Sequence, residues 1–334
     1  MLDAPAALLA ELRFDAQSLV RAHPPRVVHP NKAALWALSS PPGATHAGEL
    51  WVTRWAGHRT PASPGPLATP TIALVPTMFD YGAPSEGTEA WWVNFADPML
   101  FGFYGGGLFA QDEMQVAEHP ALASLREALL GTKLPPRTME GRDTPTPVLV
   151  MGVERRCAVD TTPDAAAGRP FGLYGNLFAR ASRDVVQRAT RVLDPPTRSN
   201  ILAIAAPPPS NGPYTLSQIR AIHHTAFTGF SAARWCGQRR WMDALRTGRV
   251  RTEIHTGYWG CGAFGGNRVL TSALPLLAAR DAGVDAVIFH TVNEAGLADA
   301  EAAVRLADAT RGAGDERFEW LAAQGFVWGV SDGN

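Results

Sequence analysis

The sequence predicts an α/β protein in which strands and helices form a layered sandwich. From residue 71 onward, short apolar runs alternate with longer segments whose apolar residues recur at helical spacing. In addition, 46% of the 334 residues are hydrophobic, which is enough to build a substantial core and excludes a disordered chain. This length suits either one large α/β domain or two smaller ones.

The short apolar runs are predicted to be strands, because they are too short for helices and follow one another at the spacing of an α/β layer. In chain order they lie at residues 50–55, 71–75, 91–95, 148–151, 201–205 and 286–289. One more strand is expected to end at Thr256, where a glycine-rich loop begins.

The longer periodic segments are predicted to be helices. The first is expected at residues 6–20, where apolar side chains gather on one side of a helix. The others are expected at residues 111–131, 183–193, 217–227, 269–282 and 297–310. The helix at 111–131 is predicted to be interrupted or restarted at Pro120, because proline lacks a backbone donor.

The domain organisation follows from a proline-rich stretch at residues 60–66. Its prolines cannot supply the backbone donors that a helix or a central strand needs, so we interpret it as a linker or surface loop. The sequence therefore predicts an N-terminal accessory segment and linker at residues 1–66 and the main domain at residues 67–334.

Charge and cysteine content exclude several classes of protein. The 30 basic residues are matched by 31 acidic ones, so there is no net basic excess of the kind that favours nucleic-acid binding. Cys157, Cys236 and Cys261 form no Cys-x-x-Cys pair, which argues against a disulfide framework and a cysteine zinc site. We expect no cofactor or metal and no signal peptide or membrane span, and hence a cytoplasmic protein.

The first segment that carries chemistry runs from residue 94 to residue 113, from a strand through a glycine-rich loop into a helix. Gly105–Gly107 let backbone N–H groups approach an anion, and the helix that follows presents its positive end. Neither common nucleotide-binding motif is matched. Asp112 and Glu113 lie in the first helical turn, where acids also stabilise the helix dipole; a tight turn and this dipole effect remain the alternative interpretation.

The second segment is the loop at residues 256–267, which contains five glycines and precedes a helix. It again offers backbone donors at a helix N-terminus. Its aromatic residues Tyr258, Trp259 and Phe264 are candidates for packing on a ribose or a base. Cys261 is disfavoured as a nucleophile, because no base partner can be assigned to it.

These two segments together resemble the catalytic segments of the poly(ADP-ribose) glycohydrolase family. The resemblance lies in Asn94-Phe95-Ala96-Asp97, the triple glycine, Gln111-Asp112-Glu113, and Thr256-Gly257-Tyr258-Trp259-Gly260-Cys261-Gly262-Ala263-Phe264. It extends over about residues 70–292. It implies a macrodomain-like mixed sheet sandwiched by helices, with an N-terminal accessory segment, and a glycosidase that acts on O-glycosidic ADP-ribose linkages.

The resemblance also implies roles for individual residues. Glu113 takes the place of the catalytic acid, and Asp112 that of its neighbour, which contacts the distal ribose. Tyr174 falls in the region that supplies a substrate-covering tyrosine, with Phe171 as a competitor. The implied substrate-binding set is Asp97, Gly105, Gly106, Gly107, Gln111, Tyr174, Gly257, Tyr258, Gly260, Cys261, Gly262, Ala263 and Phe264.

Four departures from the family pattern bear on the substrate. Asp112 is one methylene shorter than the usual Glu, and Asn94 and Asp97 appear with the family's Asp and Asn exchanged. Tyr258 replaces an Asn, and Val292 stands near the place of an adenine-stacking aromatic. The expected partner is ADP-ribose or poly(ADP-ribose) on modified macromolecules, with no membrane and no obligate protein partner. Three functions stay open: hydrolysis of poly(ADP-ribose), removal of mono-ADP-ribose from protein or nucleic acid, and binding of ADP-ribose without hydrolysis.

Overall fold

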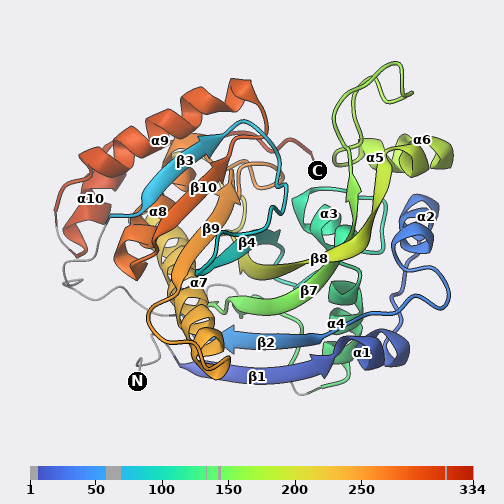
Figure 1. Ribbon diagram of the computed structural model, residues 1–334. Coiled ribbons are helices and arrows are strands. Elements are labelled where there is room, and N and C mark those ends of the chain that lie inside the picture. Colours follow the sequence, from blue (N-terminus) through green and yellow to red (C-terminus); the bar gives the residue numbers. More distant parts are fainter. Residues whose placement is uncertain (1–6, 58–68, 133, 142–143, 313, 334) are drawn as a thin grey trace.

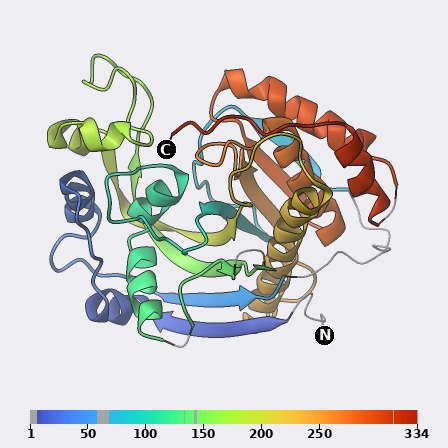
Figure 2. The same cartoon turned by 180° about the vertical axis from the view of Figure 1, so that it is seen from behind.

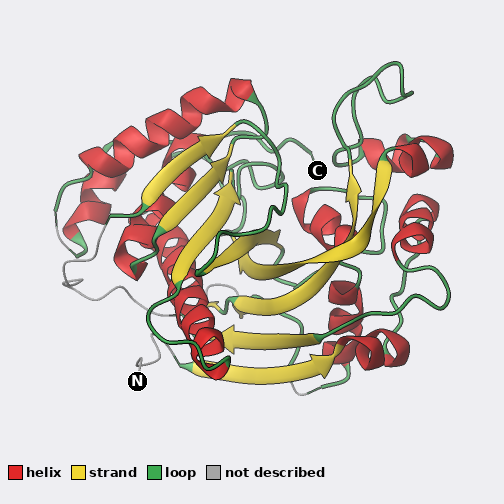
Figure 3. Ribbon diagram, viewed as in Figure 1, coloured by secondary structure: helices red, strands yellow, loops and turns green. Residues whose placement is uncertain are grey.

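The computed structural model describes residues 7–57, 69–132, 134–141, 144–312 and 314–333, so the predicted linker at 60–66 lies outside the described residues. An eight-stranded mixed sheet forms the centre, in the order β1-β2-β7-β8-β4-β9-β10-β3 (Figures 1 and 3). Its strands are β1 (Leu8–Asp15), β2 (Glu49–Trp55), β3 (Thr71–Val75), β4 (Thr88–Ala96), β7 (Val148–Val159), β8 (Thr190–Ala205), β9 (Arg251–Gly257) and β10 (Ala286–His290). A separate two-stranded sheet pairs β5 (Met139–Glu140) with β6 (Thr144–Pro145).

Helices cover both faces of the sheet. One face carries α7 (Leu216–Asp243), α8 (Arg268–Ala282), α9 (Leu297–Ala309) and α10 (Glu316–Ala323), with the 3₁₀ turn η1 (Glu294–Gly296) before α9. The other carries α1 (Ala16–Ala22), α2 (Pro30–Ser39), α3 (Gln111–Glu118), α4 (Ala121–Leu130), α5 (Leu177–Arg180) and α6 (Arg183–Arg188). The described residues contain no helix that is both long and apolar enough to cross a membrane.

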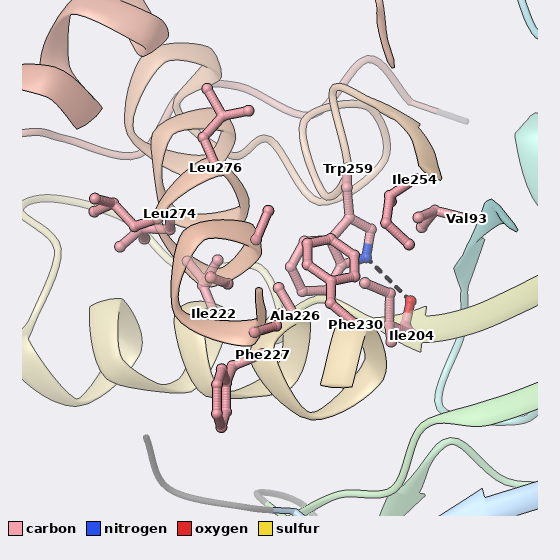
Figure 4. Close-up of a cluster of buried hydrophobic side chains, with 14 of the residues drawn as sticks. Val93, Ile204, Ile222, Ala226, Phe227, Phe230, Ile254, Trp259, Leu274 and Leu276 are labelled. Carbon is pink, nitrogen blue, oxygen red and sulfur yellow. Dashed lines mark hydrogen bonds between the residues drawn. The ribbon is translucent and has the colours of Figure 1, made fainter. Parts of the chain in front are cut away.

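Two hydrophobic cores lie between these layers, because successive strand side chains point to opposite faces. On β4, Trp91 and Val93 join the core beneath α7 and α8, while Ala90 and Trp92 join the core beneath α3 and α4. Figure 4 shows part of the first core, in which aromatic and aliphatic side chains of α7 and α8 meet the sheet. Both faces of β4 are therefore buried.

The direction of the strands determines at which edge of the sheet the two glycine-rich segments lie. β8, β4, β9, β10 and β3 run parallel to one another, whereas β1, β2, β7 and β8 pair antiparallel. Because β4 and β9 are parallel neighbours, the loops that follow them leave the same edge of the sheet. The carboxyl edge of parallel strands is where open α/β sheets bind ligands.

Most predicted elements are confirmed, some with different bounds. The strand at 71–75 has the bounds predicted, and the break of the helix at 111–131 falls at Pro120, between α3 and α4. The helix predicted at 217–227 continues to Asp243, whereas the one predicted at 183–193 ends at Arg188 because β8 begins at Thr190. The short helices α2, α5 and α10 were not predicted.

The helix predicted at residues 6–20 is wrong over its first half. Residues 8–15 form β1, in which five positions are partly buried and three are exposed, and β1 pairs with β2 along its length. A helix begins only at Ala16, where the Asp15 carboxylate accepts a hydrogen bond from the Ser18 N–H. Pairing with β2 outweighs the helix preference of these leucines, because β-sheet context overrides local propensity. The sheet is thus continuous across the predicted boundary at residue 66, and the division into two units stays a prediction.

Candidate active site

Side-chain hydrogen bonds of Gln111 hold the first turn of α3 against the end of β4. The Gln111 side chain accepts a hydrogen bond from the Phe95 N–H (2.7 Å) and donates one to the Val93 carbonyl (3.0 Å). Its amide thus pairs with the strand backbone as a neighbouring strand would. Since Asp112 and Glu113 follow directly, this contact fixes where their carboxyl groups lie.

Both carboxyl groups are buried at this helix N-terminus. Glu113 is 3% and Asp112 6% exposed. The Glu113 Oε2 accepts a hydrogen bond from the Ala110 N–H (3.0 Å), and the Asp112 Oδ1 accepts one from the Asn94 amide (2.9 Å). Burial raises the pKa of each, and the charge of Glu113 raises the pKa of Asp112 further. The pair therefore holds a proton more firmly than carboxyl groups in water do.

Asp97 lies within electrostatic reach of this pair, since its charge raises the pKa of both Asp112 and Glu113. Its own carboxylate accepts a hydrogen bond from the Met99 N–H (2.8 Å). The buried residue that contacts Asp112 directly is Asn94, which is 0% exposed. The exchange of Asp and Asn in residues 94–97 therefore puts the neutral amide, and not the acid, against Asp112.

Tyr174 is brought to the same helix end. The neighbouring Gly175 exchanges two backbone hydrogen bonds with Phe109, and the Tyr174 hydroxyl accepts one from the Gln111 backbone. Burial raises the pKa of Tyr174 to about 12, and the charges of Asp332 and Glu113 add to this shift. Its competitor Phe171 is 77% exposed. The structure therefore brings Tyr174, rather than Phe171, close to Glu113.

The first glycine loop packs against the N-terminal segment. The Gly105 carbonyl accepts hydrogen bonds from the N–H groups of Val28 and His29, both 3.0 Å. A groove of about 460 Å³ borders this loop. Its lining consists of Arg26, Val28, residues 102–108, Arg126, Glu127 and Leu130, and does not include Asp112 or Glu113.

Because of this packing, Gly105 and Gly106 differ in how much space a side chain would have. A Cβ on Gly105 would collide with the Arg26 carbonyl oxygen, whereas the nearest atom to a Cβ on Gly106 is 3.6 Å away. We expect Gly105→Ala to lower the free energy of unfolding by about 1–3 kcal/mol, as overpacking does. Gly106→Ala, the matched control, is expected to change it by less than about 0.5 kcal/mol. Urea unfolding of both variants checks this; equal stabilities would contradict the packing described here.

The second glycine loop follows β9 and meets the end of β4. A Cβ on Gly257 would lie 3.6 Å from the Phe95 ring. The Tyr258 hydroxyl of this loop donates a hydrogen bond to the carbonyl of Gly296 in η1. Phe264 of the same loop packs against the core beneath α7 and α8. The structure thus brings the two predicted segments together at one edge of the sheet.

Trp259 is not available to a substrate, and Cys261 is not available as a nucleophile. Trp259 is 2% exposed and donates its Nε1–H to the Ile204 carbonyl (3.0 Å), so the prediction that it packs on a ribose or base is wrong (Figure 4). The Cys261 thiol lies 2.9 Å from the Thr271 hydroxyl, and burial raises its pKa to about 12. A thiol with such a pKa is a poor nucleophile at neutral pH.

The C-terminal tail crosses this loop, which the sequence did not indicate. The Gly329 N–H donates to the Gly265 carbonyl (2.8 Å), and the Asp332 N–H donates to the Gly262 carbonyl (3.3 Å). Beyond the loop, the Asn176 amide donates to the Gly333 carbonyl (2.8 Å). The tail therefore connects the second glycine loop with the segment that follows Tyr174, and both cartoons show its end beside α3 and α5 (Figures 1 and 2).

Lys32 of α2 is another part of the site that the sequence did not indicate. It is 0% exposed, and its Nζ donates to the Tyr104 carbonyl (2.8 Å). Burial lowers its pKa to about 8, an effect that the charges of Glu113 and Asp112 oppose. A lone lysine in a sequence has no signal that separates it from a surface lysine, since burial is a property of the fold.

Comparison with known proteins gives one family and a set of solved structures. Residues 85–299, more than half of the chain, match the family described as "Poly (ADP-ribose) glycohydrolase (PARG), Macro domain fold". No curated protein matches the sequence.

Among the solved structures, poly(ADP-ribose) glycohydrolase from Thermomonospora curvata is 18% identical with a TM-score of 0.44, covering 88% of this chain and 93% of that one. The same enzyme bound to the inhibitor ADP-HPD is 17% identical with a TM-score of 0.43, covering 88% and 92%. The Deinococcus radiodurans glycohydrolase in complex with ADP-ribose is 13% identical with a TM-score of 0.42, covering 89% and 94%.

Proposed function

This chain belongs to the poly(ADP-ribose) glycohydrolase family, and on that premise we propose that it hydrolyses the ribose glycosidic bond of ADP-ribosylated macromolecules and releases ADP-ribose. The family and its macrodomain fold are those that the sequence predicts. The observation that supports the reaction most directly is the buried carboxyl of Glu113 at the N-terminus of α3, whose pKa burial raises. Cleavage of a glycosidic bond requires a carboxyl group that is still protonated near neutral pH.

The mechanism we propose uses this carboxyl twice. Protonated Glu113 donates its proton to the leaving oxygen as the bond to the anomeric carbon breaks through an oxocarbenium-like state. The diphosphate of the substrate offsets the positive charge that develops. Ionised Glu113 then takes a proton from water, which attacks the anomeric carbon and restores the acid.

We propose that the diphosphate lies between the two glycine loops. Both loops leave the same edge of the sheet, and glycine backbones allow N–H groups to approach an anion. Asp112 would contact the distal ribose, and Phe264 would hold the diphosphate and ribose in place. The remaining substrate-binding residues of the proposal are Asp97, Gly105–Gly107, Gln111, Tyr174, Gly257, Tyr258, Gly260, Cys261, Gly262 and Ala263.

The class of substrate is decided by one experiment. Purified protein is incubated with poly(ADP-ribosyl)ated protein and with mono-ADP-ribosylated protein and nucleic acid, and free ADP-ribose is measured. Release from the polymer supports a poly(ADP-ribose) glycohydrolase. Release from mono-modified substrates alone supports the narrower eraser, which the departures at Asp112, Tyr258 and Val292 favour. ADP-ribose binding without release from any substrate would overturn hydrolysis and indicate a binding module.

Two broader proposals accompany this function. We propose that residues 67–334 form the catalytic domain and residues 1–66 an accessory segment, which adds β1 and β2 to the sheet. The three cysteines are free, as Cys157, Cys236 and Cys261 form no disulfide, which is consistent with the cytoplasmic location that we propose.

The C-terminal tail yields a prediction about affinity. The Asp332 Oδ2 would lie 3.0 Å from a Cβ on Gly262, so its charge stands where the proposal places a dianionic diphosphate. We expect Asp332→Asn to bind ADP-ribose about two- to fivefold more tightly, because a like charge near the surface costs roughly 0.3–1 kcal/mol. Calorimetric titration measures this, with Asp243→Asn, an exposed acid at the far end of α7, as the control. Unchanged or weaker binding in Asp332→Asn would count against this placement of the diphosphate.

A further inference from the structure

Lys32 is an unusual residue in this chain. Of the 30 basic side chains, 28 are arginines and two are lysines, Lys32 and Lys133. Lys32 is fully buried, and a buried ammonium persists only where specific partners compensate for the loss of water. Unlike arginine, lysine changes its protonation readily when it is buried. The fold therefore places a basic group that can titrate within electrostatic reach of two buried carboxyl groups.

The contacts of Lys32 join both ends of the first glycine loop. Its Nζ donates to the carbonyl of Tyr104, the residue directly before the triple glycine. The same Nζ lies 5.2 Å from the ring centre of Phe109, two residues after the triple glycine, and 5.9 Å from that of Phe178. An ammonium over an aromatic face is attracted by the ring electrons. Lys32 thus ties the loop to α2 from inside the protein.

The position of α2 is itself fixed on the other side. The amide of Asn31 donates to the carbonyls of Phe178 (2.8 Å) and Ala181 (2.9 Å), at α5 and just beyond its end. The Phe178 ring stacks on Phe109, with centres 4.1 Å apart. Lys32 is therefore held by a packed cluster and is not free to swing toward solvent.

The charges around Lys32 favour a single shared proton. The charges that act on it are those of Glu113 and Asp112, and it lowers the pKa of both in return. Asp97, beyond the end of β4, opposes this effect on both carboxyls, and the charges of Glu113 and of the tail residue Asp332 both act on Tyr174. The ammonium stabilises the first carboxylate that forms, and the charge of Glu113 in turn raises the pKa of Asp112, so the two carboxyl groups share one proton.

We propose that Lys32 is a positioning residue of the active site, which anchors the first glycine loop through Tyr104 and offsets part of the negative charge of the two carboxyl groups. This inference rests on the proposed function of Glu113. It means that the N-terminal segment, which lies outside the family match at residues 85–299, contributes a residue that the reaction needs.

The charge coupling is tested without activity, by titrating the lysine side chains with NMR in protein labelled at lysine. There are two lysine signals, and the Lys133→Arg variant assigns them. We expect the Lys32 signal to titrate with a pKa near 8 in the native protein and at a lower pH in Glu113→Gln and in Asp112→Asn, because each variant removes a negative neighbour. A Lys32 pKa near 10.4, or one that neither variant moves, would overturn the coupling.

The role in the reaction is tested by pH–rate profiles of Lys32→Met and Lys32→Arg. At the alkaline limb Glu113 loses its proton, and the charge of Lys32 favours that loss. Removing the charge is therefore expected to move this limb to higher pH in Lys32→Met, while misplacement of the loop lowers the maximal rate by about 10-fold or more. Lys32→Arg keeps the charge and is expected to keep the position of the limb.

The rate profiles and the NMR titration distinguish a folding defect, the absence of a positioning role and the absence of hydrolysis. A folding defect in Lys32→Met lowers the rate equally at every pH and leaves the limb in place, which would overturn the positioning role. A rate within about twofold of the native protein with an unchanged profile would overturn it as well. If the native protein hydrolyses none of the substrates, the proposed function fails, and the NMR titration still decides whether Lys32 is coupled to the carboxyl pair.

Discussion

The Glu113→Gln variant is expected to lose turnover by about 10²–10⁴-fold while it binds ADP-ribose with nearly native affinity. Glutamine keeps the shape of the side chain and an oxygen that can accept from the Ala110 N–H, but it has no proton to give to a leaving oxygen. Release of ADP-ribose under single-turnover conditions and calorimetric titration of the product measure the two effects separately. A variant with native turnover would remove Glu113 from the mechanism.

The stability of this variant shows whether lost turnover reflects lost chemistry. Burial raises the pKa of Glu113 above its value in the unfolded chain, so the folded state holds its proton more tightly. Folding stability contributed by this group is therefore present at low pH and lost as the pH rises through the range between the two pKa values. Glutamine does not titrate, so we expect the variant to be at least as stable as the native protein at pH 8, with a smaller difference at pH 4.5. Thermal unfolding at both pH values checks this.

Asp112→Asn is the matched control for the chemistry. It lies in the same helical turn, is equally buried and keeps an oxygen for the Asn94 amide. The charges that act on Glu113 are those of Lys32 and Asp97, and Asp112→Asn leaves both in place. We therefore expect the alkaline limb of its rate profile to keep its native position, while the maximal rate falls less than in Glu113→Gln. Equal loss in both variants at every pH would contradict a distinct role for Glu113.

The Trp259→Ala variant is expected to lose about 3–5 kcal/mol of unfolding free energy, as truncation of a buried aromatic does. The Trp259 indole fills the core between α7 and the sheet, and its Nε1–H satisfies the Ile204 carbonyl. Trp259→Phe, which keeps most of the packing and loses the hydrogen bond, is expected to lose about 1–2 kcal/mol. Urea unfolding measures both losses.

An exposed aromatic residue provides the comparison. Phe171→Ala, at a side chain that is 77% exposed, is expected to change the free energy of unfolding by less than about 0.5 kcal/mol. If Trp259 instead packed on the substrate, Trp259→Ala would weaken ADP-ribose binding and leave the unfolding free energy unchanged. That result would contradict a purely structural role for Trp259.

The sequence by itself determined the alternation of strands and helices and the family, and it predicted the acidic pair. Short apolar runs such as residues 71–75 predict their own bounds, because the local composition of such a run marks a strand. The carboxyl pair was found because Gln111-Asp112-Glu113 follows a triple glycine, and this order is contiguous in the chain. A motif whose residues lie within about 20 positions of one another in the chain can be recognised before the fold is known.

The tertiary structure alone decided which side chains meet. Residues 8–15 become a strand because β2 lies beside them, Trp259 turns into the core because the sheet lies below it, and Lys32 reaches Tyr104 across 72 positions of the sequence. Burial and long-range contacts depend on how the layers pack, and they set the pKa of Glu113, Asp112 and Lys32. The acidic pair could therefore be predicted from the sequence, whereas the charge of Lys32 that acts on it became visible only once the chain was folded.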